Sequence, residues 1–324
     1  MNDRLKVSFV ENRPTTVLPA KKSRRQEIQA SMERLWLRNP DQFNPERDCL
    51  QRQRIQRTLE ALKNRMQLEG KRAVDLGCAA GTFSRLLRDA GAKVDAVDVA
   101  TNALERLKES DMHDITAIHD CLPTTKLDDN AYDIIVCTEL ISYLHPNEYR
   151  LLFAELARLI KADGIMVFST ALDTETEDPI DRLVMLAETE FIVDQWILSY
   201  HSLYLKLCHF FEAPGNFVKA SQDKELRQQE LYSRRSLSRR WFQLNSSAVM
   251  ATAWRLIACI TSPLGRMVRQ SQWIMDRLEK ICRCISSQSG ISQAIFVGRR
   301  RPLNFPLPPD KIPKEVKHKR EVWE

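Results

Sequence analysis

The sequence predicts an α/β fold in which a doubly wound, mostly parallel sheet carries helices on both faces. Short apolar runs alternate with segments of helical periodicity between residues 72 and 189, and this alternation is typical of strand–helix–strand units. A turn with two glycines, at 77–81, directly follows the first predicted strand. Because parallel strands bring their carboxyl ends to one edge of a sheet, we expect a ligand site at that edge.

The expected elements follow in order along the chain. Apolar residues at helical spacing predict helices over 28–40 and 48–66, with a turn at 39–45 between them. An alternating run over 190–205 predicts a sixth strand, and 292–298 predicts the last one. Between residues 70 and 190 we expect strands at 72–76, 93–98, 115–119, 132–138 and 164–170, with helices at 81–90, 101–109, 146–161 and 178–189.

Residues 206–290 interrupt the alternation and overlap the basic part of the chain. Residues 219–301 contain 16 Lys and Arg against 5 Asp and Glu, whereas the net charge of the whole chain is +6. Apolar residues recur at helical spacing over 249–285, and we expect Pro263 to kink or split this segment. The predicted division is a mobile N-terminal arm (1–27), the α/β domain with its N-terminal helices (28–205), a basic helical insertion (206–290), the final strand of the sheet (291–301) and a Pro-rich tail (302–324).

The composition is that of a globular protein in a reducing compartment. Apolar residues make up 43% of the chain and charged residues 28%, which are ordinary values for soluble domains. The eight cysteines show neither pairing nor the spacing of a zinc site, so we expect free thiols and no bound metal. The N-terminus lacks the apolar run of a signal peptide, and no charge-free window of about 18 apolar residues occurs. We therefore expect a cytoplasmic protein.

The glycine turn predicts a cofactor that contains a nucleoside. Gly77 and Gly81 let a ligand approach backbone amides at the start of a helix. Asp98 ends the second strand with a carboxylate that suits the two hydroxyls of a ribose. Asp75, two residues before the first glycine, would repel a pyrophosphate but suits a ligand with a positive amino group. S-adenosylmethionine has these parts, namely an amino-acid end, a sulfonium and an adenosine.

Five segments, taken together, resemble the motifs of class I S-adenosylmethionine-dependent methyltransferases. The resemblance covers roughly residues 48–204 and the strand near 292–298. It implies a Rossmann-like, mostly parallel seven-stranded sheet whose last strand is antiparallel, with the helical insertion between strands six and seven. Residues 39–43 and 139–144 look most like nodulation-type and ubiquinone-type small-molecule methyltransferases. The five segments are 74–81, 95–99, 119–123, 132–145 and 159–168.

The resemblance also implies which residues hold the cofactor. Asp75 would orient the amino end, Asp98 would bind the ribose and Asp120 would face the adenine, although each carboxylate could instead serve only its own turn or strand end. Ala79 stands where the family often has glycine, and its methyl group would narrow the cleft. The full set of expected cofactor contacts is Asp75, Gly77, Cys78, Ala79, Gly81, Asp98, Val99, Asp120, Cys121 and Glu139.

Candidates for catalysis and acceptor binding are fewer. Glu139, Tyr143 and His145 follow the fourth strand, where similar enzymes transfer the methyl group, so each is a candidate general base. A core tyrosine and a helix-capping histidine are the structural alternatives. In-line attack with well-aligned reactants needs no strong base. The expected acceptor contacts are Trp36, Phe43, Tyr143 and His201.

The predicted function is transfer of a methyl group from S-adenosylmethionine, leaving S-adenosylhomocysteine, to oxygen or nitrogen of a small or lipid-like acceptor. The rival functions are a non-catalytic cofactor-binding scaffold, attached to a membrane or partner through the insertion, and a nucleic-acid methyltransferase. The insertion itself could be a helical cap, or a membrane-surface element through 241–286 that holds the protein at the inner face of a membrane. A nucleic-acid platform ranks lowest because no RNA-binding signature accompanies the charge.

Overall fold

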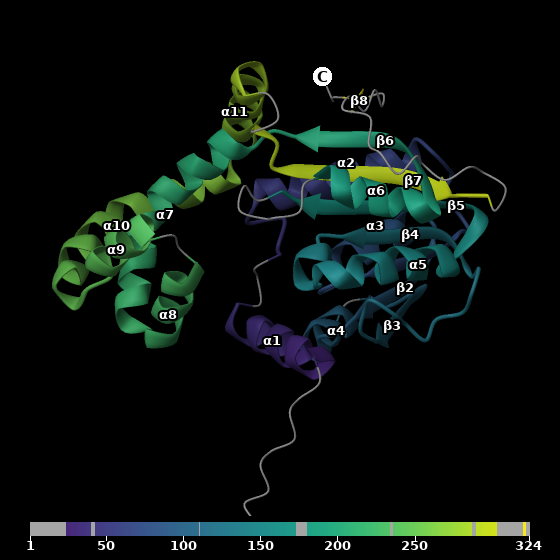
Figure 1. Ribbon diagram of the computed structural model, residues 1–324, viewed down its shortest axis with the longest axis horizontal. Helices are drawn as coiled ribbons and strands as arrows, with labels where there is room; N and C mark the ends of the chain where they lie inside the picture. Colours follow the sequence, from purple (N-terminus) through teal and green to yellow (C-terminus); the bar gives the residue numbers. More distant parts are fainter. Residues whose placement is uncertain are drawn as a thin grey trace, which may run out of the picture.

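The computed structural model describes residues 24–39, 43–109, 111–172, 180–233, 236–286, 290–302 and 320–321. Most of the predicted N-terminal arm (1–27) and Pro-rich tail (302–324) lies outside the described residues. The described part consists of an α/β domain and a set of helices that extends away from it (Figure 1).

The sheet confirms the predicted architecture. Its strand order is β3-β2-β1-β4-β5-β7-β6-β8. Neighbours from β3 to β5 are parallel, whereas β7 runs antiparallel between β5 and β6. A short last strand, β8, pairs with the edge of β6. The strands are β1 (Arg72–Leu76), β2 (Lys93–Asp98), β3 (Ile115–His119), β4 (Tyr132–Thr138), β5 (Ile160–Ala171), β6 (Phe191–Ser199), β7 (Gln293–Arg300) and β8 (Arg320–Glu321).

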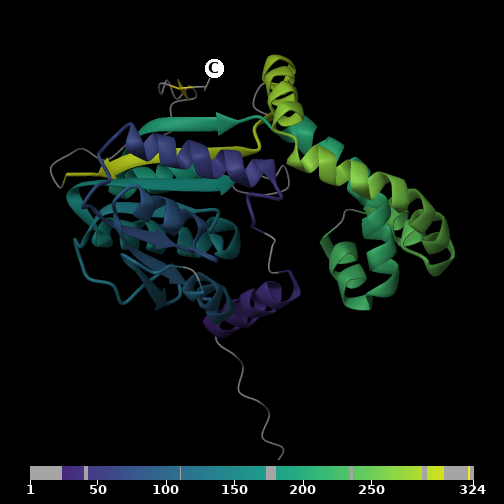
Figure 2. The ribbon, with the colours of Figure 1, turned by 180° about the vertical axis from the view of Figure 1, so that it is seen from behind.

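Helices cover both faces of this sheet, as the alternation predicted (Figures 1 and 2). Ile134 and Val136 of β4 are buried with residues of α2 and α3, whereas Ile135 between them is buried with residues of α5 and α6. Successive strand residues point to opposite faces, so a strand buried on both sides is apolar throughout. The domain helices are α1 (Arg24–Arg38), α2 (Cys49–Lys63), α3 (Thr82–Asp89), α4 (Thr101–Lys108), α5 (Tyr149–Leu159) and α6 (Ile180–Glu190).

The end of the sixth strand differs from the prediction. β6 ends at Ser199, and a helix begins at Ser202 instead of further strand. Tyr204 and Cys208 are completely buried, four residues apart, on one side of this helix. A short apolar run fits both the alternating and the helical period, and here tertiary packing of the i, i+4 pair selects the helix.

Five helices make up the segment that extends from the domain, which we call the helical arm (residues 202–285). In both views it leaves the sheet at the end of β6 and extends away from the domain (Figures 1 and 2). Cys49 and Tyr204 of α2 and α7 lie in a buried cluster with Met275 of α11, at the base of the arm. The arm consists of α7 (Ser202–Gln222), α8 (Lys224–Ser233), α9 (Ser236–Asn245), α10 (Ala248–Gln270) and α11 (Gln272–Ile285).

Pro263 was expected to kink or split the helical segment, and of these two outcomes the split does not occur. It lies inside the continuous helix α10, and the chain breaks only at Ser271, whose side chain caps the start of α11. Near the proline, α10 packs closely on α7, because a Cβ at Gly265 would lie 3.1 Å from the Cβ of Phe211. We attribute the continuity of α10 to this packing, which stabilises the helix although the proline removes one backbone donor.

Candidate functional site

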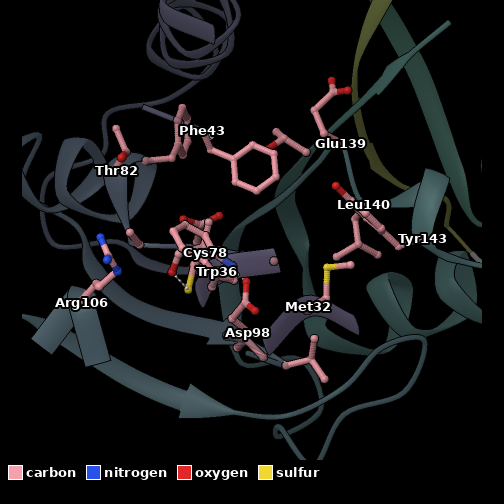
Figure 3. Close-up of a pocket in the computed structure, with 18 of the residues that line it drawn as sticks. Met32, Trp36, Phe43, Cys78, Thr82, Asp98, Arg106, Glu139, Leu140 and Tyr143 are labelled. Atoms are coloured by element: carbon pink, nitrogen blue, oxygen red, sulfur yellow. Dashed lines mark hydrogen bonds between the residues drawn. The ribbon is translucent and has the colours of Figure 1, made fainter. Parts of the chain in front are cut away.

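A cavity of about 590 Å³ lies at the carboxyl ends of β1, β2 and β4, where the strand order reverses. This is the usual position of a ligand in an open α/β sheet, and the volume is in the range of cofactor sites. Figure 3 shows Asp98 and Cys78 across the cavity from Glu139 and Tyr143. Of the expected cofactor contacts, those that line the cavity are Asp75, Gly77, Cys78, Ala79, Asp98, Val99, Asp120, Cys121 and Glu139.

Gly81, the remaining expected contact, shapes the turn and is not among the residues that line the cavity. It has a φ of 73° at the N-cap of α3, and a Cβ there would lie 2.2 Å from Leu107. Gly77 has a φ of 76°, and a Cβ there would lie 2.7 Å from Leu140. The left-handed φ favours glycine at both positions, and a side chain at either one would also have to displace a leucine side chain. Ala79 between them also has a left-handed φ, of 53°.

Asp98 holds the turn against the start of α4. Its Oδ2 accepts a hydrogen bond of 2.8 Å from the backbone N–H of Ala79, and its Oδ1 accepts one of 2.8 Å from that of Ala100. Burial raises the pKa of Asp98, although these backbone donors oppose the rise. A carboxylate has about four acceptor positions. Each oxygen can therefore still accept a hydrogen bond from a hydroxyl group in the cavity.

Asp75 is more deeply buried, with 2% of its surface exposed. Its Oδ2 accepts a 2.6 Å hydrogen bond from the hydroxyl of Ser84 on α3. Burial raises the pKa of Asp75 to about 6, and the nearby Asp98 adds to the rise. The carboxylate lines the cavity and is costly to ionise without a cation, which favours a positively charged ligand group beside it.

Arg54 of α2 is a cavity residue that the sequence analysis missed. Its side chain is 12% exposed, and its Nη1 lies 3.7 Å from Oε1 of Glu139. Its Nε is buried and has no hydrogen-bond partner among the described residues. A cation with a free donor in this position suits a carboxylate of the ligand. One sequence signal could have found it. Arg54 precedes Thr58 and Ala61 by four and seven residues, so it lies on the same side of the helix as these two residues, which are buried.

Asp120 organises the loop after β3. Its Oδ1 and Oδ2 accept hydrogen bonds of 2.8 Å from the backbone amides of Cys121 and Lys126. The loop places Cys121 and Leu122 in the cavity wall beside Asp120. Asp120 thus holds its own loop and also lines the cavity.

The three catalytic candidates do not lie together. Glu139 has a left-handed φ of 58° and accepts hydrogen bonds from Ser169 at 2.9 Å, Gln293 at 2.8 Å and the amide of Ala171 at 2.8 Å. Tyr143 lines the cavity, and burial together with Glu139 raises its pKa. Its phenol is therefore held neutral and is a poor base.

His145, the third candidate, is not among the residues that line the cavity. Its Nδ1 accepts a 3.3 Å hydrogen bond from the amide of Asn147, and its own amide donates to Glu148 at 2.7 Å. These contacts cap a short helical turn, which is the structural alternative that the sequence left open.

Helix α1 and the loop after it cover the cavity with aromatic side chains. Trp36 is 4% exposed, and its ring lies 5.8 Å from that of Phe43. Glu33 attaches α1 to the start of α4, where it accepts hydrogen bonds from the amides of Thr101 at 2.7 Å and Asn102 at 3.1 Å. Burial alone would raise the pKa of Glu33, but these donors hold it below its ordinary value.

His201 lies outside the cavity wall, unlike the other expected acceptor contacts. It is 2% exposed, and its ring nitrogens contact Gln53 at 2.7 Å and Ser292 at 3.2 Å. Glu279 of the arm lies 3.6 Å from the same ring. The structure therefore places His201 in a buried polar network between α2 and the arm. Within the described ranges, no group of three or more His, Cys, Asp or Glu residues is placed to hold a metal ion.

Comparisons with known proteins give a consistent family. A family model described as "Methyltransferase domain" matches residues 46–244. The ubiquinone biosynthesis O-methyltransferase of Burkholderia thailandensis is 32% identical over 110 residues, which cover 32% of this chain and 45% of that protein. The chain therefore spans less than half the length of the curated relatives it matches.

Two solved structures of methyltransferases are similar to parts of this chain. Magnesium protoporphyrin IX methyltransferase from Synechocystis has a TM-score of 0.48 at 16% identity. The match covers 56% of this chain and 92% of the Synechocystis chain. A putative sarcosine dimethylglycine methyltransferase from Galdieria sulphuraria has a TM-score of 0.46 at 17% identity and covers 77% of this chain and 86% of its own.

Proposed function

Because this chain belongs to the methyltransferase-domain family and is a class I enzyme that uses S-adenosylmethionine, we propose that it methylates oxygen or nitrogen of a small or lipid-like acceptor. The observation that carries the proposal is the composition of the cavity, whose lining combines charged groups that suit the cofactor with apolar and aromatic groups.

The charged groups of the lining suit the parts of S-adenosylmethionine. Asp98, whose oxygens already accept a hydrogen bond each from a backbone amide, would also accept them from the ribose hydroxyls, and the loop that Asp120 holds would face the adenine. Asp75 suits the amino group, and the free Nε of Arg54 suits the carboxylate of the amino-acid end. When bound, S-adenosylmethionine supplies an activated methyl group and a neutral thioether leaving group.

The apolar part of the cavity lining suits an acceptor with apolar surface. Ile28, Met32 and Phe43 come from the N-terminal cover, whereas Leu140 and Tyr143 follow β4. Such a wall would orient the acceptor by shape. Much of the rate gain of a transfer between two bound reactants can come from such alignment, with effective molarities of about 10⁵ M or more.

None of the described groups around the acceptor wall is arranged as a strong base. Both oxygens of Glu139 accept hydrogen bonds from Ser169, Gln293 or Ala171, and the phenol of Tyr143 has a raised pKa. Glu139 is therefore placed to hold the loop after β4, with Arg54 beside it. We propose that the acceptor brings its own nucleophilic oxygen or nitrogen and that the enzyme aligns it.

Calorimetry with S-adenosylhomocysteine tests the donor side. The wild-type protein should bind, Asp98→Ala should lose binding, and Asp111→Ala, which changes an exposed carboxylate on the loop after α4, should bind like the wild type. Absence of binding by folded wild type would contradict the proposal.

Transfer of a labelled methyl group to lipid and water-soluble extract fractions tests the acceptor side. Label in the lipid fraction or in small polar molecules supports the proposal and divides its two acceptor classes. Cofactor binding with no transfer into any fraction would favour a non-catalytic scaffold, and label in nucleic acid would favour a nucleic-acid methyltransferase.

A further inference from the structure

Helix α10 of the arm has an apolar face that no other described element covers. The residues of this outer face are seven, four, four and three positions apart, and several are highly exposed: Val249 is 87% exposed, Leu256 71%, Ile260 69% and Met267 58%. Leu264, at 39%, completes the row. Apolar residues at this spacing form one continuous stripe along a helix.

The opposite side of α10 is already packed. Ala251 and Val268 are buried, and Gly265 lies against Phe211 of α7. The outer stripe is therefore an additional apolar face, and not the core-facing side of the helix. A contiguous exposed apolar surface of this kind marks an interaction site.

Positive charge accompanies the stripe. α10 contains three arginines and no acidic residue. Arg269 is turned inward, where it pairs with Asp48 and Glu212. Arg255 and Arg266 are exposed and each directly precedes a residue of the stripe, in sequence.

Neighbouring helices of the arm add the same kind of side chain. Trp241 of α9 is 54% exposed and follows the exposed Arg239 and Arg240. Trp273 of α11 is 68% exposed, with the guanidinium of Arg277 lying 5.7 Å from its ring centre. Tryptophan is enriched where a protein meets the interface of a bilayer.

We propose that the outer face of α10 docks on an anionic lipid surface, with the helix lying in the plane of the interface. An apolar stripe beside arginines, with no acidic residue on the helix, is the pattern of an interfacial helix on anionic lipid. A second copy of this chain is the less complementary occupant, because it would bring Arg255 and Arg266 against the same two arginines.

The length and bend of the helices agree with an in-plane arrangement. Among the described residues, no single helix is long and apolar enough to cross a membrane. The pair Ser238–Asn245 and Val249–Gln270 meets the test only together, and its two helices are bent by 86°.

The arm is joined to the domain at the edge that holds the cavity. β6 ends at Ser199 and α7 begins at Ser202, so the arm starts at the carboxyl ends of the strands (Figures 1 and 2). Lipid docking would hold the enzyme by the edge of the sheet that holds the cavity. That position would suit a lipid-like acceptor, and this part of the inference rests on the proposed function. The docking itself does not depend on methyl transfer.

Sedimentation with vesicles tests the docking without any assay of activity. The full chain is mixed with vesicles of phosphatidylcholine alone or of equal parts phosphatidylcholine and phosphatidylglycerol. We expect binding to the anionic vesicles, weakened by salt because the Debye length falls from about 8 Å at 0.15 M to about 3 Å at 1 M. Equal binding to both vesicle types, or to neither, would overturn the proposal.

Two double variants separate the apolar and the charged contributions. Leu256→Ser with Ile260→Ser should lower the vesicle affinity on the order of tenfold or more, because two exposed apolar side chains are lost. Arg255→Gln with Arg266→Gln should lower the affinity for anionic vesicles about thirtyfold. Loss of two basic residues near an anionic surface changes the binding constant by roughly one and a half powers of ten. All four positions are exposed, so circular dichroism should show an unchanged fold.

A matched control replaces exposed leucines elsewhere. Leu37 and Leu151 are 70% and 54% exposed on α1 and α5, and the double serine variant should bind vesicles like the wild type. Light scattering after size exclusion identifies the competing occupant. A wild-type dimer that the Leu256 and Ile260 variant makes monomeric, without vesicle binding, would show that the stripe joins two copies and would overturn the lipid proposal.

Discussion

Glu279 of α11 and Arg57 of α2 form a two-pronged ion pair, with distances of 3.0 and 3.1 Å between the guanidinium nitrogens and the carboxylate oxygens. Glu279 is 4% exposed. Gln53 also donates to its Oε2 at 3.2 Å, and His201 lies beside it. This buried network fastens the arm to the α/β domain.

Replacing Glu279 should therefore destabilise the protein strongly. Glu279→Gln leaves Arg57 buried without its counter-ion, which costs about 3–5 kcal/mol in comparable pairs. Urea unfolding at neutral pH measures this loss. The control Asp194→Asn breaks the half-exposed pair with Arg65 and should cost no more than about 1 kcal/mol.

The same variant has a defined pH dependence. Burial alone would raise the pKa of Glu279, but hydrogen bonds from His201 and Arg57 outweigh it and hold the pKa well below its usual range. A carboxyl group whose pKa is lowered by folding stabilises the folded state at pH values above its pKa in the unfolded chain, which is about 4.3. This contribution to stability is lost as the pH falls. The difference between wild type and Glu279→Gln should thus be full at pH 7 and shrink only below about pH 4; a constant difference down to pH 3 would contradict the assigned cause.

Asp75→Asn should have the opposite effect on stability. The folded pKa of Asp75 is about 6, above the unfolded value of about 3.9, so the proton-bound form stabilises the fold at low pH and this contribution is lost as the pH rises through 6. The variant should gain up to about 3 kcal/mol relative to wild type at pH 7.5 and nothing at pH 4. Its affinity for S-adenosylhomocysteine should fall. Higher stability with unchanged affinity would limit Asp75 to a structural role.

Arg54→Met should weaken binding only of ligands that carry the amino-acid carboxylate. The affinity for S-adenosylhomocysteine should fall about tenfold, the value of a lost charge-assisted hydrogen bond of about 1.5 kcal/mol. The affinity for 5′-methylthioadenosine, which lacks the amino-acid end, should stay the same. An equal loss for both ligands, measured by calorimetry, would show that Arg54 only supports the cavity wall.

Ala79→Gly should increase the affinity for S-adenosylhomocysteine severalfold, because it removes a methyl group from the cavity wall. It also relieves a left-handed φ of 53°, while glycine adds chain entropy to the unfolded state, so the free energy of unfolding should change by less than about 1 kcal/mol. The neighbouring Ala80→Gly has no such strain to relieve and should destabilise the protein by about 0.5–1 kcal/mol. Unchanged affinity in Ala79→Gly would show that the methyl group does not restrict the cleft.

Glu33→Ala should loosen the cover over the cavity. The carboxylate of Glu33 belongs to α1 and caps the start of α4, and the variant removes it. Loss of such a cap costs about 1 kcal/mol. S-adenosylhomocysteine should then dissociate about fivefold faster in stopped-flow measurements. Glu27→Ala, an exposed change on the same helix, should leave the dissociation rate unchanged, and equal rates in all three proteins would argue that α1 does not retain the ligand.

Much of the α/β domain could be predicted because its signals are local. Each of β1, β2 and β4 is a short apolar run next to a turn, and the turn at Gly77 is specified by conformation and space together. The position of the Asp98 carboxylate at the edge of the sheet could be predicted for the same reason. Asp98 ends a strand whose neighbouring strands were also predicted. These inferences needed only strand order and the side-chain period.

The parts that could not be predicted depend on contacts between distant segments. Arg54 is one arginine among several in α2, and only the packing of α2 on the sheet turns it toward the cavity. His201 contacts Gln53 and Ser292, which are both distant from it in the sequence. No local pattern indicates that these contacts bury the ring. Pro263 remains inside a helix, next to the packing of α10 on α7.

Arg54 and Arg57 lie one turn apart on α2, and they face different parts of the molecule. Arg54 lines the cavity, whereas Arg57 holds Glu279 of the arm. Helix α2 thus belongs both to the wall of the proposed cofactor site and to the attachment of the arm that is proposed to dock on lipid.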